Sequence, residues 1–147
     1  MRLFAIIVLA LTPCVGIASE RLPIPSENAI KLWQQYCLNY SRDHSSLRRS
    51  LQASSQFNET NESWFTGRGL AFDVGLPMDG TCVAAFLPSD GSETAFSWLR
   101  SFVKVLDSSF FENREGTMQF AVMQSKFTVF PAHDEDSGVV FFTLMNE

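Results

Sequence analysis

The strongest constraint on how this chain folds is a pair of cysteines, Cys37 and Cys82. Cys37 lies on an apolar stripe of helical spacing, and Cys82 opens an apolar run at residues 81–87 that is typical of a central strand. In an exported chain two cysteines form a disulfide, which here fastens a first helix to a central strand. Two free thiols are the alternative, and the spacing is not the C-x-x-C of a redox-active pair.

The N-terminus has the layout of a secretory signal peptide. A positively charged start precedes an unbroken apolar run over residues 3–11, and the small residues Gly16 and Ala18 suit a cut after position 18. We therefore predict that residues 1–18, which hold the remaining cysteine, are removed on export to the periplasm or out of the cell. One domain without a transmembrane segment is left at residues 19–147. An uncleaved anchor is the alternative, but the run is shorter than the roughly 20 residues that span a bilayer.

Three segments show the three- and four-residue spacing of apolar side chains that indicates helices. The first is a helix of about four turns that begins at Ser26. A shorter helix is expected around Leu47 and Leu51, and a third helix runs to Leu106 from the turn at residues 88–92.

Strand patterns occupy the rest of the chain. Apolar side chains alternate around residues 70–74, fill both faces of 81–87, alternate in one or two strands between 117 and 130, and return at 139–145. The polar segment at 54–63 is expected to be an exposed loop. The predicted order is α-α-β-β-α-β-β. We therefore predict a two-layer α+β fold with a largely antiparallel sheet of about four strands, helices packed on one face and one disulfide.

Two groups of side chains are candidate interaction sites. Arg42, Arg48 and Arg49 form a basic patch near the second helix that suits a phosphate or an acidic protein surface, or else is a solvated helix face. Trp64 and Phe65 follow the polar loop, where they form either a recognition edge or a lid on the core.

A cluster of possible metal ligands lies at His133, Asp134, Glu135 and Asp136. Adjacent residues do not easily converge on one ion, and calcium-binding loops use alternate positions followed by a later bidentate acid. The segment is therefore predicted to be a polar hairpin tip with at most weak calcium association. No cofactor is expected.

Enzyme motifs are not evident in the sequence, which has no G-x-S-x-G, P-loop or dinucleotide fingerprint. Asp73 and Asp79 are candidate acid–base carboxylates, and His44 and His133 are the only histidines. A deep pocket lined by these residues would favour an enzyme, whereas a flat exposed patch around Trp64 and an open sheet face would favour a protein partner. The net charge of −5 argues against a nucleic-acid partner.

Three sites match the N-glycosylation pattern, at Asn39, Asn58 and Asn61. In a eukaryotic host the two sites in the 54–63 loop are expected to carry sugar. In a bacterial host the pattern has no such meaning.

The signal segment, the helix cysteine within WQQYCLNY and the strand cysteine within GTCVAAF together give a layout that resembles small exported bacterial domains of uncharacterised function. The resemblance covers most of residues 19–147 as an arrangement of elements and carries over no functional residue. The leading hypothesis is an exported, non-enzymatic binding or accessory protein with an envelope or secreted protein as its partner. The alternative is a small envelope hydrolase or ligand-binding enzyme.

Overall fold

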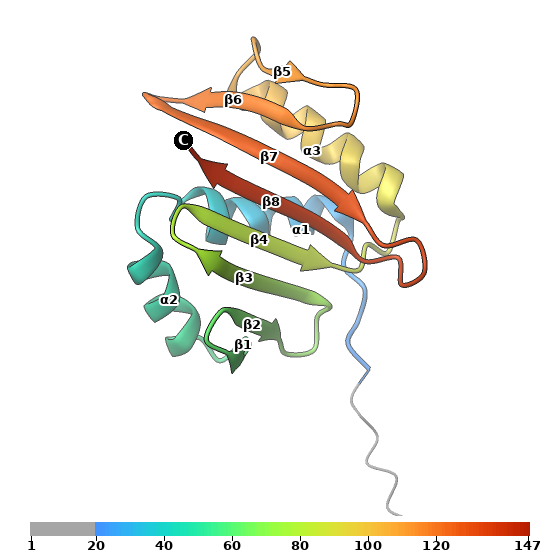
Figure 1. The fold of residues 1–147 in the computed structure, drawn as a ribbon. Helices are drawn as coiled ribbons and strands as arrows, with labels where there is room; N and C mark the ends of the chain where they lie inside the picture. Colours follow the sequence, from blue (N-terminus) through green and yellow to red (C-terminus); the bar gives the residue numbers. More distant parts are fainter. Residues whose placement is uncertain (1–19) are drawn as a thin grey trace, which may run out of the picture.

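The computed structural model describes residues 20–147, so the predicted signal peptide at residues 1–18 lies outside the described residues (Figure 1). Three α-helices form in the described range, at Ser26–Trp33 (α1), His44–Ala53 (α2) and Ser92–Leu106 (α3). A π-helical turn, η1, continues α1 directly over Gln34–Leu38. None of the described helices is long and apolar enough to cross a membrane.

The described part of the chain is mostly sheet. Eight strands form there, at Phe57–Asn61 (β1), Trp64–Gly67 (β2), Phe72–Met78 (β3), Thr81–Phe86 (β4), Phe111–Glu112 (β5), Met118–Val122 (β6), Ser125–His133 (β7) and Val140–Asn146 (β8). They make one sheet with the order β1-β2-β3-β4-β8-β7-β6-β5, in which the strand pairs are antiparallel. The predicted α+β fold with about four strands in the order α-α-β-β-α-β-β is therefore wrong.

The additional strands are short or bury few side chains. Residues 54–63 were expected to be a loop because of their polarity, but they contain β1, an edge strand in which only Phe57 is buried. β5 has only two residues and carries no periodicity that a sequence pattern could reveal. Between residues 117 and 130, Val122 pairs with Ser125, so a two-residue turn separates β6 from β7.

The chain fills the sheet from both edges towards its centre (Figure 1). β1 to β4 build one half in sequence order, α3 crosses behind the sheet, and β5 to β8 build the other half from the opposite edge. β4 and β8 therefore meet in the middle, with Ala84 opposite Phe142. The final strand of the chain closes the sheet.

The helices lie on one face of this sheet (Figure 1). α1 and α3 pack side by side, α3 also contacts β6, and α2 lies against the edge strand β1. Their inward side chains include Leu47 and Leu51 of α2 and Leu99 and Val103 of α3, all of them buried. The core is thus the layer between these helices and the inner face of the sheet.

Two carboxylates fix the first turns of α1 and α2. The backbone N–H of Ser26 donates to both carboxylate oxygens of Asp90 at 3.2 Å, and its hydroxyl also donates to Asp90. Because Asp90 belongs to the loop before α3, it holds the starts of α1 and α3 together. In α2, Asp43 accepts the backbone N–H of Ser46 at 2.9 Å and so satisfies one of the free donors at a helix start.

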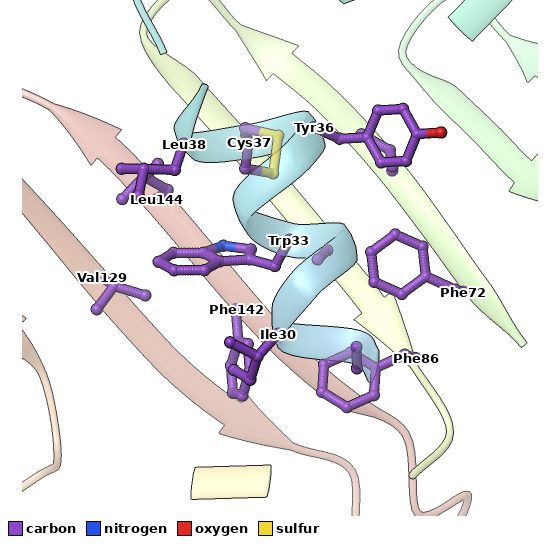
Figure 2. Packing of buried hydrophobic residues seen from close by; sticks show 14 of the residues in the cluster. Ile30, Trp33, Tyr36, Cys37, Leu38, Phe72, Phe86, Val129, Phe142 and Leu144 are labelled. Carbon is purple, nitrogen blue, oxygen red and sulfur yellow. A yellow bond between two sulfur atoms is a disulfide. The ribbon is translucent and has the colours of Figure 1, made fainter. Parts of the chain in front are cut away.

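Trp33 lies at the centre of the core, between α1 and the sheet (Figure 2). Its side chain is 0% exposed and makes edge-to-face contacts with Phe102 of α3 at 5.9 Å and Phe142 of β8 at 6.3 Å between ring centroids. The indole N–H has no hydrogen-bond partner, which costs about 1–3 kcal/mol. The packing of a large aromatic side chain against two elements offsets this cost.

The predicted disulfide is confirmed. Cys37 of η1 is bonded to Cys82 of β4, with their Cα atoms 5.4 Å apart (Figure 2). The π-helical turn that carries Cys37 has its own hydrogen bond, from the Asn39 N–H to the Gln34 carbonyl at 2.9 Å. The wider turn lets neighbouring side chains on η1, including Leu38, face the core beside the cystine.

We predict that the disulfide contributes about 4 kcal/mol to the free energy of unfolding, because it closes a loop of 46 residues in the unfolded chain. The double variant Cys37→Ala/Cys82→Ala should lose roughly this amount in urea-induced unfolding, and reduction of the wild type should produce a similar loss. Two reactive thiols in the freshly purified protein would contradict the prediction.

A second prediction concerns the turn between β6 and β7. Met123 is 97% exposed and has a φ of 56°, a conformation that costs a residue with a side chain roughly 1–2 kcal/mol. Met123→Gly should raise the free energy of unfolding by about 0.5–1 kcal/mol after the greater freedom of glycine in the unfolded chain is counted. Gln124→Gly is the control, because Gln124 has no positive φ, and it should not stabilise the protein.

Candidate functional site

A polar hollow of about 590 Å³ lies between α2, the β1–β2 turn and the end of β3. His44, Ser45 and Arg48 line it from α2, and Asp79 lines it from the β3–β4 turn. A second hollow of about 410 Å³ adjoins it and shares His44 and Asp79, with Arg42 on its wall. The fold therefore brings the predicted basic patch, His44 and Asp79 to the same place, whereas Asp73, the other candidate carboxylate, does not line either hollow and is paired with Arg21.

Arg48 and Arg49 of this basic patch are held by hydrogen bonds to neighbouring groups. Arg48 donates to the backbone carbonyl of Glu62, lies 3.8 Å from the carboxylate of Glu59, and places its guanidinium 5.9 Å from the centre of the Phe65 ring. Arg49 donates to the hydroxyl of Ser46 at 2.9 Å. With Asp79 also in the wall, the hollow presents a balanced set of charges rather than a trap for anions.

His44 is the one imidazole in the hollow. Partial burial lowers its pKa below the usual value, the carboxylate of Asp79 raises it, and the guanidinium of Arg48 lowers it. Within the described residues, no hydrogen bond joins His44 to Ser45 or to Asp79, as a Ser-His-Asp mechanism would require. The groups are near one another, but they are not arranged as catalytic partners.

The second candidate is the face of the sheet that points away from the helices, which we call the open sheet face. Cys82, Ala84 and Phe86 of β4 point to the core, so the residues between them point outward. The register of the paired strands shows which residues of the neighbouring strands point the same way. The centre of the open sheet face consists of Trp64, Gly75, Met78, Thr81, Val83, Ala85, Thr128, Phe130, Ala132, Phe141, Thr143 and Met145. No helix of the described chain covers it (Figure 1).

Large apolar side chains lie on several strands of the open sheet face. Phe130 and Met145 are each 40% exposed on the neighbouring strands β7 and β8, and Phe141 lies on the same face of β8. Met78 at the end of β3 and Phe111 on the edge strand β5 are more exposed still. A row of exposed large apolar side chains across several strands is the kind of surface that marks an interaction site.

The structure separates the two predicted aromatic residues. Trp64 is half-buried on the open sheet face, where its indole covers Gly75, and a Cβ at that glycine would lie 2.8 Å from the ring. Phe65 points the other way and is 0% exposed in the core. Trp64 therefore belongs to a surface, whereas Phe65 is not accessible to a partner.

Polar groups border the open sheet face. On β3, Asp73 forms an ion pair with Arg21 from the segment before α1. On the edge strand β1, Asn58 and Asn61, both in glycosylation patterns, pair with outward-facing residues of β2. The third such asparagine, Asn39, follows η1 on the helical side of the sheet. An apolar centre with a polar border is the usual anatomy of a protein interface.

The predicted polar tip lies between β7 and β8. Asp134 accepts the backbone N–H groups of Asp136 and Ser137, which holds the turn and lowers the pKa of Asp134. His133 contacts the ring of Phe96 at 5.7 Å between centroids. Among residues 20–147 no three His, Cys, Asp or Glu side chains are grouped so as to hold a metal ion.

Two surfaces therefore stand out, the polar hollow and the open sheet face. No protein-family model, curated protein or solved structure matches the chain. Their chemistry differs: the guanidinium of Arg48 in the hollow already contacts the Glu62 carbonyl and the Glu59 carboxylate, whereas apolar side chains on the open sheet face are left in contact with water. The sequence predicts the basic patch and a sheet with helices on one face, but not which residues apart from Trp64 form the open sheet face. The best signal for these residues is the run of apolar side chains on both faces of β8.

We predict that Asp79→Asn lowers the pKa of His44 further, because it removes the carboxylate that favours the charged imidazole. An NMR titration of the His44 ring measures this directly, with Asp73→Asn on the opposite face as the control. Since the folded-state pKa lies below the unfolded value, the unfolded chain binds more protons, and His44 should destabilise the fold as the pH falls through about 6.5. An unchanged His44 pKa in Asp79→Asn would contradict the placement of the two groups.

Proposed function

We propose that this protein is an exported, non-enzymatic accessory protein that binds another envelope or secreted protein through its open sheet face. The observation that carries the proposal is the set of large, partly exposed apolar side chains on a face that no described helix covers. Phe130, Phe141 and Met145 form its middle, and Trp64 extends it across β2. Such a surface gains free energy when a partner removes it from water.

Several features of the chain support export and a protein partner. The disulfide is of the kind that persists in oxidising compartments, and the N-terminal sequence has the layout of a signal peptide. The net charge of −5 disfavours a nucleic acid. The charged groups that border the face are few and include the Arg21–Asp73 ion pair, so the partner is expected to present an apolar surface of its own.

The second candidate function is a small envelope hydrolase or ligand-binding enzyme that uses the polar hollow. The observation in its favour is that His44 and Asp79 line the same hollow as Ser45. It ranks second because these side chains are not linked by the hydrogen bonds that would orient a nucleophile and its base.

The proposed function is tested by placing a photo-activated crosslinking residue at Thr143, in the middle of the open sheet face, in cells that export the protein. We expect Thr143 to give an adduct with a different exported protein, and the same residue at Val105 on α3, exposed on the helical side, to give none. The partner identified in this way is then purified for binding measurements.

Binding of the purified partner should weaken about tenfold or more in Phe130→Glu, because a charge would be moved into an apolar interface. Trp98→Glu is the matched control, since Trp98 is an aromatic residue with the same exposure, 40%, on α3. A loss of binding in His44→Ala with none in Phe130→Glu would overturn the proposal in favour of the polar hollow.

A further inference from the structure

We propose that in the free protein the open sheet face is covered by a second copy of this chain, packed sheet against sheet in a two-fold dimer. This inference deepens the proposed function. It rests on that function in one respect, because both require the open sheet face to be a surface that binds protein. It adds the identity of the molecule that occupies the face before the partner arrives.

The size of the face matches what a stable dimer needs. Eight strands about 4.8 Å apart, with a mean length of between five and six residues at about 3.4 Å per residue, give a projected area of about 700 Å². A standard stable interface buries about 800 Å² on each partner. Stacking the faces of two copies would therefore cover nearly this area on each copy, at the spacing of about 10 Å that is usual for stacked sheets.

The centre of the face suits contact with itself. A two-fold dimer brings the same patch of each protomer together, so the patch must be compatible with its own copy. The centre of the sheet falls between β4 and β8. The outward residues there, Val83, Ala85, Phe141, Thr143 and Met145, carry no charge that would oppose its copy.

The charges near the face occur with opposite charges nearby. Asp73 is paired with Arg21 on one side of the sheet. On the other side, Lys126 of β7 and Glu147 after β8 are joined through their backbones, and the Glu147 carboxylate accepts the hydroxyl of Thr128 at 2.8 Å. The face as a whole is thus apolar in the middle and near neutral at its ends, although the chain has a net charge of −5.

The two edges of the sheet are poorly suited to association, which leaves the face as the favoured route. β1 exposes Asn58, Glu59 and Asn61 along the edge, and β5 has only two residues to offer to a new strand. Short and polar edges are the means by which sheets avoid pairing with another copy. Self-association is therefore expected through stacked faces rather than through a continuous sheet.

The test is sedimentation velocity and equilibrium of the purified exported protein, with its disulfide intact, over a wide range of concentration. We expect a monomer–dimer equilibrium that Phe130→Glu/Met145→Glu shifts to monomer, with a dissociation constant raised about tenfold or more. Trp98→Glu, at matched exposure on α3, should leave the equilibrium unchanged. High salt should not dissociate the dimer, because apolar contacts are not screened.

The far-ultraviolet circular dichroism and the unfolding midpoint of each variant establish that the variants are folded. A wild type that stays monomeric at every concentration overturns the inference, and so does a dimer that Trp98→Glu breaks and Phe130→Glu/Met145→Glu does not. A monomer whose partner binding is still lost in Phe130→Glu overturns self-association but leaves the proposed function standing. A dimer broken by the face variants, with no effect of Phe130→Glu on partner binding, supports the inference and removes the proposed function.

Discussion

The attachment of the first helix to the middle of the sheet is the constraint on which the rest of the structure depends. Cys37 bonds the end of this helix to β4, and Trp33, one turn earlier, packs against Phe142 of β8 and Phe102 of α3. One helix thus holds both central strands and the neighbouring helix. All three contacts lie on the same side of the sheet, and no helix of the described residues covers the other side.

The parts of the fold that the sequence predicts are those in which one residue type has a single strong role. The cysteine pair is such a case, as is the apolar stripe of α3. The strand count was wrong because β1 buries little beyond Phe57 and β5 is too short for any periodicity. In addition, β2 is a separate strand of four residues, and residues 117–130 contain the two strands β6 and β7. Edge strands take their stability from backbone pairing with a neighbour, and backbone pairing leaves no pattern in the side chains.

The candidate sites, like the fold, could be predicted from the sequence only in part. The arginines predicted as a patch line two adjoining hollows: Arg48 and Arg49 of α2 line the polar hollow and Arg42 lines the second. The partners of Arg48, the Glu62 carbonyl and the Glu59 carboxylate, come from β1 and the turn after it, which the sequence does not reveal as a strand. The open sheet face depends on the register of distant strands, so Trp64 is only one member of a surface whose other members lie far along the chain.

The path of the chain through the sheet has a consequence for the time course of synthesis. A ribosome delivers the N-terminal half first, and the disulfide can form once Cys82 has emerged. One edge of β4 remains unpaired until its neighbour is made, because β8 at Val140–Asn146 follows the other seven strands of the sheet along the chain. For that interval the nascent protein carries an unpaired apolar strand at what will become its centre, and a truncated chain that lacks the final strand would keep that strand permanently available to other molecules.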